Sequence, residues 1–204
     1  ASFWQAIAKE FSTFKNIYGY GLMNEPHDLT PETSWFDMAQ ASINAIREVD
    51  TNTLIMVGGN DWSSAERWIE QSDTLKYLKD PANNLAFEAH VYFDKDASGT
   101  YKYSYEEEEC YPEKGIDRVK PFVEWIKQNK FHGFIGEYGI PDNDPRWNET
   151  LDLFLGYLQE NGINGTYWAA GPWWDSYFMA ITPKDGKDRP QMPIIEKYTS
   201  TFKK

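Results

Sequence analysis

The stretch GLMNEPHD, residues 21 to 28, is the most informative segment of this chain. An apolar run ends at Met23 and is followed at once by Asn24, Glu25 and Pro26. Proline has no backbone N–H and cannot extend a central strand, so Glu25 stands where a strand stops. Its carboxylate is either an accident of loop composition or one member of a catalytic pair whose second member lies elsewhere in the chain.

Outward from this stretch, the hydrophobic pattern alternates between the helix period and short buried runs. The runs rich in β-branched and aromatic residues predict strands at 17–23, 53–59, 83–93, 133–139 and 163–171. Amphipathic stretches predict a helix before the first strand, a second that starts at Thr30-Pro31, and others at 64–79, 117–130, 147–161 and 191–202. Strands that alternate with helices imply parallel pairing and an α/β fold.

Two architectures fit this order, an open doubly wound sheet and part of an eight-stranded barrel. The first usually carries a glycine-rich phosphate loop after a strand, and GYGLMN (19–24) lacks the third glycine. The barrel is favoured by polar and aromatic residues at or just past the strand ends, namely Asn24, Glu25, Asn60, Asp61, Trp62, His90, Tyr92, Glu137, Tyr138 and Trp168. In parallel barrels that face builds the active site.

Composition excludes several classes of function. The formal net charge of -12 argues against nucleic-acid binding, and no apolar run is long enough for a transmembrane helix. Three histidines and one cysteine, without HExxH or CxxC, offer no zinc ligand set, and we expect neither metal nor cofactor. The single Cys110 is a free thiol or pairs with a cysteine on another segment. Aromatic residues make up 17%, which suits stacking against sugar rings as well as core packing.

Glu25 and Glu137 each end a predicted strand. If both strands belong to one small barrel, the two carboxylates face the same mouth. A pair about 5–5.5 Å apart suits a retaining glycosidase, in which one carboxyl is acid/base and the other is the nucleophile. Taken singly, each glutamate fits a surface or salt-bridge role better than a catalytic one, and it is the paired placement beside residues typical of sugar-binding sites that favours catalysis.

At this point a resemblance to a known family becomes plain. Four segments resemble glycoside hydrolase family 5, and most closely its secreted endoglucanases of the cellulase type. They are GLMNEPHD (21–28), EAHVYFDKDASGT (88–100), GFIGEYG (133–139) and TYWAAGPWW (166–174). The resemblance implies that Glu25 is the acid/base and Glu137 the nucleophile. It also implies that Asn24 hydrogen-bonds the sugar 2-hydroxyl, that His90 and Tyr92 form a polar pair, and that Trp168 is the sugar platform.

Other aromatic residues are weaker candidates for sugar binding. Trp62 and Trp35 are possible stacking surfaces, and Trp174 is either a subsite wall or core packing. His27 follows the NEP motif and is expected to support the site from behind. DKDASG (94–99) imitates the start of a calcium loop, but the twelfth position is Tyr105 where a glutamate is required.

The chain departs from the family in one respect: it matches from the third barrel helix onward. We therefore expect residues 1–204 to be the C-terminal portion of a single catalytic barrel, a TIM (β/α)8 fold without its first three βα units. The strands at 17–23 and 163–171 would be left as unpaired edges, which invite association. The expected partner is the N-terminal half of the barrel, as a second chain, a cleaved segment or a copy of the chain itself.

The resulting functional hypothesis is an extracellular, retaining endo-β-1,4-glucanase that acts on a β-1,4-glucan polysaccharide or oligosaccharide. One alternative keeps the enzyme and changes the substrate to mannan, xyloglucan or mixed-linkage glucan, because loops decide specificity on a shared fold. The other alternative is a non-catalytic carbohydrate-binding fragment, which the missing strands favour and the two intact glutamates oppose.

Overall fold

The structure, a computed structural model, describes residues 1–30 and 32–199. The chain forms two compact units. Unit 1 comprises Ala1–Ala89 with Pro121–Phe134, and unit 2 comprises His90–Lys120 with Ile135 to the end of the described chain. The division falls within two strands and one helix, so each unit is built from segments that are separated in the sequence.

Five strands form one sheet in chain order, β1-β2-β3-β4-β5. They are β1 (Gly19–Gly21), β2 (Leu54–Gly58), β3 (Leu85–His90), β4 (His132–Tyr138) and β5 (Asn164–Tyr167). The first three pair in parallel, with Tyr20 opposite Ile55 and Ile55 opposite Leu85. A parallel sheet in which neighbours in sequence are neighbours in space is what repeated βα units produce, and the prediction of an α/β fold is confirmed.

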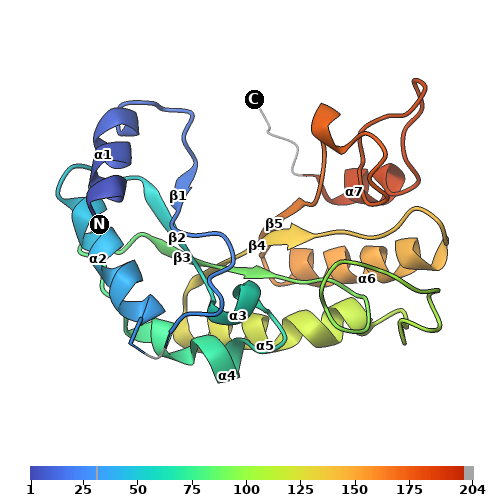
Figure 1. Ribbon diagram of the computed structural model, residues 1–204, viewed down its shortest axis with the longest axis horizontal. Coiled ribbons are helices and arrows are strands. Elements are labelled where there is room, and N and C mark those ends of the chain that lie inside the picture. Colours follow the sequence, from blue (N-terminus) through green and yellow to red (C-terminus); the bar gives the residue numbers. More distant parts are fainter. Residues whose placement is uncertain (31, 200–204) are drawn as a thin grey trace. The chain divides into compact units, whose positions relative to one another are not determined.

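Helices separate the strands in each unit (Figure 1). Unit 1 holds α1 (Ser2–Phe11), α2 (Trp35–Arg47), the short α3 (Asn60–Ser63), α4 (Trp68–Ser72) and the 3-10 helix η1 (Asp73–Tyr77). The helix α5 (Lys114–Asn129) begins in unit 2 and ends in unit 1. Unit 2 holds α6 (Arg146–Glu160), the 3-10 helix η2 (Pro172–Trp174) and α7 (Met192–Tyr198). Helices α1 and α2 pack together, as do α6 and α7.

Two helix predictions are wrong in detail. The second helix begins at Trp35 rather than at Thr30-Pro31, because the Ser34 hydroxyl caps it by accepting the N–H of Asp37 at 3.2 Å. Pro31 itself lies outside the described residues. The helix predicted at 64–79 is broken into α4 and η1, and the Ser72 hydroxyl there accepts the N–H of Asn60 at 2.9 Å. The predicted end of the last helix, at 202, also lies outside the described residues.

Each unit has its own aromatic core. In unit 1, Trp68 and Phe87 both pack edge-on against Trp125, with ring centroids 5.4 and 4.9 Å apart. In unit 2, the rings of Phe93 and Phe154 lie 5.2 Å apart. All five of these aromatic residues are at most 1% exposed, so much of the high aromatic content serves packing.

A buried carboxylate closes the turn between α2 and β2. Asp50 is 4% exposed and accepts hydrogen bonds from the hydroxyls of Tyr20 and Thr53, at 2.9 and 2.7 Å. It also accepts the backbone N–H groups of Asn52 and Thr53, both at 2.9 Å. Burial opposes ionisation, but these hydrogen bonds outweigh it and lower the pKa of Asp50 to about 2.

This arrangement predicts an acid-sensitive fold. Because the pKa is lower in the folded than in the unfolded state, Asp50 stabilises the fold above about pH 4, and that contribution is lost as the pH falls towards 2. The contribution is about 2 kcal/mol. Urea unfolding at pH 7 and pH 3 should show a smaller pH dependence in Asp50→Asn than in the native chain. The matched variant Asp188→Asn, at an exposed carboxylate, should keep the native dependence; an Asp50→Asn chain that does so too would contradict the account.

Candidate active site

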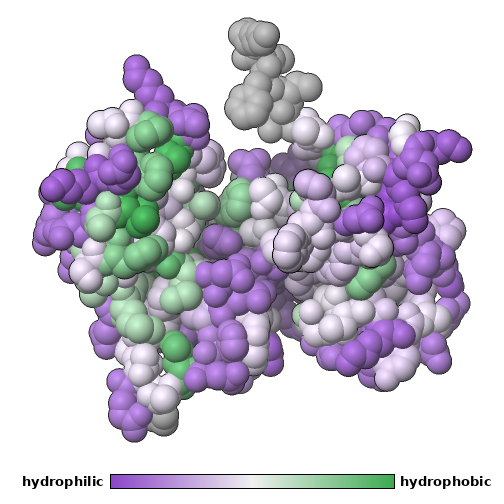
Figure 2. Space-filling view, turned by 45° about the horizontal axis from the view of Figure 1, so that its top comes forward, coloured by the Kyte–Doolittle hydropathy of each residue, from purple (hydrophilic) through white to green (hydrophobic). Residues whose placement is uncertain are grey.

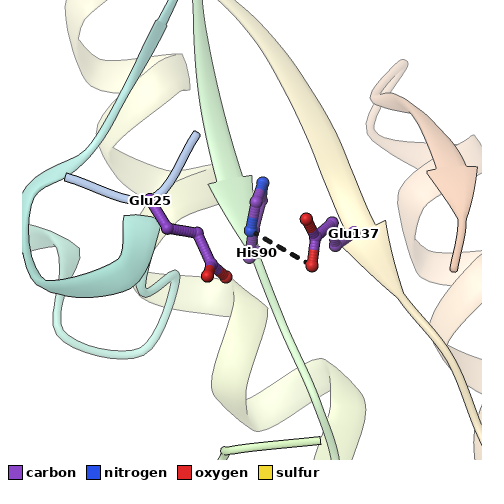
Figure 3. A group of neighbouring side chains, drawn as sticks. All are labelled: Glu25, His90 and Glu137. Carbon is purple, nitrogen blue, oxygen red and sulfur yellow. Dashed lines mark ion pairs between the residues drawn. The ribbon is translucent and has the colours of Figure 1, made fainter. Parts of the chain in front are cut away.

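Glu25 lies in unit 1, on the loop that follows β1, and is labelled in Figure 3. Its backbone is left-handed, with a φ of 46°, which is unusual for a residue other than glycine. The loop lies directly against β2, because a Cβ on Gly58 would come within 2.9 Å of the Ser63 hydroxyl and 3.0 Å of the Met23 carbonyl oxygen. Glycine at position 58 is therefore what lets the loop hold Glu25 at the end of the strand.

A second strained segment lies beside this loop. Asp61, Trp62 and Ser63 all have φ values of 55–56°, and the N–H of Trp62 donates to the Pro26 carbonyl at 3.3 Å. Runs of left-handed residues persist where the surrounding structure holds them, often at functional sites. The indole of Trp62 stacks on His27 with the rings 4.4 Å apart and 12° from parallel, and Trp62 stays 42% exposed. An aromatic surface is thus held next to the Glu25 loop.

Two of the remaining unit 1 candidates differ in exposure. Asn24 is exposed, as a sugar-binding side chain requires. Trp35 is 5% exposed, and its indole N–H donates to the Gly58 carbonyl at 2.7 Å. Because its ring is buried behind β2, the interpretation of Trp35 as a sugar-stacking residue is wrong.

His90 and Glu137 come from the ends of β3 and β4 in unit 2 (Figure 3). The N–H of Val91 donates to the Glu137 carbonyl at 3.0 Å, which sets the two strand ends side by side. The imidazole Nδ1 of His90 lies 3.6 Å from Oε2 of Glu137. These side chains are 3% and 12% exposed, so the pair is largely shielded from water.

The hydroxyl of Tyr92 donates to Oε2 of Glu137 at 2.8 Å. Burial raises the pKa of Tyr92 well above its ordinary value, and the negative charge of Glu137 raises it further. The phenol therefore stays protonated at neutral pH and donates its hydrogen bond there. A donor of this kind favours the ionised carboxylate over the neutral acid.

Trp168 follows β5 in the same unit, and its backbone N–H donates to the Tyr138 carbonyl at 2.8 Å. The indole is half-buried, and Trp174 packs edge-on against it at 5.0 Å. The two strand ends approach so closely that a Cβ on Gly139 would lie 2.4 Å from the Trp168 carbonyl oxygen. Trp168 is thereby held beside the strand that carries Glu137.

Sequence reasoning missed Tyr177, which belongs to the same cluster. Burial raises the pKa of its hydroxyl; a hydrogen bond from Trp168 lowers it, and the charge of Glu137 raises it. Its ring lies 5.0 Å from that of Trp174. The residue sits in an irregular segment after η2, where neither periodicity nor a strand end marks it as a candidate.

Comparisons with known proteins place this geometry in a family. Residues 1–173 match the family model described as cellulase, glycosyl hydrolase family 5. The chain belongs to glycosyl hydrolase family 5. The resemblance on which the sequence expectations rest is thereby confirmed.

Several relatives of this chain are named endoglucanases. Endo-beta-1,4-glucanase B of Emericella nidulans is 36% identical over 190 residues, which cover 91% of this chain and 55% of that protein. Two crystal structures of Pseudomonas stutzeri endoglucanase Cel5A, one of them in complex with cellobiose, are 41 and 42% identical with TM-scores of 0.91. The match covers 98% of this chain and 61 and 60% of theirs.

The family 5 chain thus spans little more than half the length of the relatives it matches. Its five strands are part of the barrel architecture of that family, as expected. Within the described residues, no helix has the length and apolar character needed to cross a membrane.

Proposed function

We propose that this chain is the C-terminal catalytic portion of a retaining endo-β-1,4-glucanase. The observation that carries the proposal is the Glu137 carboxylate, shielded at a strand end and hydrogen-bonded by Tyr92 at 2.8 Å. Support also comes from the order of the strands. Glu25 follows β1 and Glu137 lies in β4, and the carboxyl ends of parallel strands in one barrel point to one mouth. In the assembled site the two carboxyl groups would be about 5–5.5 Å apart.

In the first step, a carboxylate oxygen of Glu137 attacks the anomeric carbon of the sugar while Glu25 gives its proton to the glycosidic oxygen. The C–O bond to the leaving chain breaks, and an ester joins Glu137 to the sugar. In the second step, Glu25 takes a proton from water, and that water attacks the same carbon and releases Glu137. Two inversions give net retention of configuration.

The different surroundings of the two glutamates support these roles. A nucleophile must be ionised, and the hydrogen bond from Tyr92 favours that state of Glu137. An acid/base must exchange protons with solvent, and Glu25 is partly exposed on its loop. The largely buried His90 beside Glu137 would help to fix the orientation of the nucleophile.

For the substrate we propose a β-1,4-glucan outside the cell, since a polysaccharide is too large to be taken up intact. Cellobiose is bound by the related Pseudomonas stutzeri enzyme. In this chain, Trp168 would stack on the sugar at the cleavage point, with Trp174 as a side wall, and Trp62 would stack on a sugar of the leaving chain. Asn24 would hydrogen-bond the 2-hydroxyl next to the scissile bond.

The proposal includes a partner that completes the barrel, the N-terminal half of the same fold. Large apolar side chains are exposed in unit 1 on and around α1 and β1: Phe3 (65%), Phe14 (51%), Tyr18 (67%) and Met23 (54%). Figure 2 shows hydrophobic residues gathered on this unit. An apolar surface next to a strand edge is expected to be covered in the working protein.

The test is hydrolysis of a polysaccharide panel by the chain alone and by the chain mixed with the N-terminal part of a related enzyme. We expect reducing ends to appear from carboxymethyl-cellulose, with the β-anomer formed first by proton NMR, and with the mixture more active than the chain alone. If mannan or xyloglucan is cleaved in preference to cellulose, that polysaccharide replaces β-1,4-glucan as the proposed substrate. Binding of cello-oligosaccharides without turnover in either sample would contradict an enzymatic role.

A further inference from the structure

The chain that follows Tyr92 folds into a tight loop, residues 94–101, which we call the Asp94 loop. Its first residue is 1% exposed, and its carboxylate accepts hydrogen bonds from within the loop. The donors are the N–H groups of Gly99, Thr100 and Tyr101, at 3.1, 3.0 and 3.2 Å, and the hydroxyl of Ser98 at 3.1 Å. A carboxylate is an acceptor-only group, and these four donors match it, so Asp94 joins the two ends of the loop.

The Asp94 loop lies against the ring of Tyr92. A Cβ on Gly99 would come within 3.0–3.1 Å of three carbon atoms of that ring. Gly99 also has a φ of +72°, a conformation that side chains other than glycine rarely adopt. The backbone at Gly99 therefore forms a wall against the ring, and the position of the loop limits where the ring can lie.

A single buried hydroxyl ties the loop to the strand of Glu137. Tyr101 Oη accepts the N–H of Phe93, the neighbour of Tyr92, at 2.9 Å and donates to the Gly139 carbonyl at 2.6 Å. Gly139 lies two residues after Glu137. From the other side, the guanidinium of Arg118 donates to the carbonyls of Tyr92 and Lys95, the latter at 3.0 Å. The loop, the tyrosine and the end of β4 are thus joined through hydrogen bonds at fixed points.

We propose that the Asp94 loop positions Tyr92 against Glu137, and that Gly99 and Tyr101 are positioning residues for the nucleophile. The inference rests on the proposed role of Glu137 as the nucleophile. The Tyr92 hydroxyl reaches Oε2 at 2.8 Å because its ring is held between the Gly99 backbone and the protein interior. A loosened loop would let the ring move, and the Glu137 carboxylate would lose the hydrogen bond from Tyr92.

The sharpest test is Gly99→Ala compared with Gly186→Ala. Both glycines have a φ of +72°, so both variants place an alanine in the left-handed region, but nothing lies within 4 Å of a Cβ at position 186. A second pair is Tyr101→Phe against Tyr103→Phe, which removes a hydroxyl from a buried ring in one case and from a 60% exposed ring in the other. The second pair keeps the proposal testable if Gly99→Ala folds poorly.

The direct readout is fluorine NMR of protein labelled with 3-fluorotyrosine. The Tyr92 signal is identified by its absence in Tyr92→Phe. In the native chain, Glu137→Gln should shift that signal. In Gly99→Ala and Tyr101→Phe the signal should already be displaced, and adding Glu137→Gln should move it much less. The control variants should behave like the native chain, and equal behaviour of test and control variants would overturn the proposal.

The kinetic readout is the pH profile of kcat/KM on a soluble β-glucan, measured with the complete assembly. We expect the acidic limb to move up by about one pH unit in Gly99→Ala and Tyr101→Phe, as in Tyr92→Phe. The double variant Tyr92→Phe/Tyr101→Phe should show no further shift, and additive shifts would contradict the proposal. If the assembly does not hydrolyse glucan but the Tyr92 fluorine signal responds to the variants as described, the proposed function is refuted. The proposal that the Asp94 loop positions Tyr92 against Glu137 would still stand.

Discussion

Replacing Glu137 with glutamine should lower kcat/KM for β-glucan hydrolysis by at least about 10⁴-fold. An amide oxygen is too weak a nucleophile to form the glycosyl ester, although its carbonyl still accepts the Tyr92 hydroxyl and keeps the local packing. The measurement is the release of reducing ends, with thermal unfolding recorded to show that the fold is intact. Glu160→Gln, at an exposed carboxylate in the same unit, is the matched control and should keep native activity.

Residual activity within tenfold of the native protein would remove Glu137 from the mechanism. That outcome would leave its contacts with Tyr92 and His90 as a structural polar cluster. Buried ion pairs and hydrogen bonds of this kind occur in cores without any role in chemistry.

Replacing Glu25 with glutamine should lower kcat on natural glucan by about 10²–10⁴-fold, the usual range for general acid catalysis. The loss in the first step should be much smaller for an aryl cellobioside with a good leaving group, because such an oxygen departs without protonation. Added azide should restore turnover of that substrate by replacing the water that Glu25 activates, and should give a β-glycosyl azide. The basic limb of the pH profile should also disappear.

The matched control is Glu10→Gln, an exposed carboxylate in unit 1. Equal losses on the natural and the activated substrate, without an effect of azide, would show that Glu25 only binds or supports the site. Since a glutamine keeps the size of the side chain and the left-handed backbone at position 25, a general collapse of the loop is not expected.

The fold was predictable because its strands are short apolar runs rich in β-branched and aromatic residues. Each predicted strand range contains an observed strand except that β4 begins one residue early, at His132, and the polar residues that end them marked the candidate site. Helix boundaries were less predictable, since they depend on single side chains. Ser34 was not recognised as the cap, and Pro31 was preferred because proline is common in the first turn.

Side-chain environments were harder to foresee than elements. Trp35 and Trp62 look alike in the sequence, yet one is buried against Gly58 and the other stacks on His27 at the surface. Trp62 lies in a run of left-handed residues, Asp61, Trp62 and Ser63, none of which is a glycine. Tyr177 was missed because only tertiary contacts bring it into the cluster around Trp168 and Glu137, and no local pattern marks it.

The central claim is that Glu137 forms a covalent bond with the sugar. The most direct measurement is incubation of the complete assembly with a 2-deoxy-2-fluoro-β-cellobioside that carries a good leaving group, followed by peptide mass spectrometry. The fluorine slows both steps and the good leaving group keeps the first one fast, so the intermediate should accumulate. The account predicts one added 2-fluorocellobiosyl group on the peptide that contains Glu137. A label on another residue, or hydrolysis without any label and with inverted configuration, would contradict it.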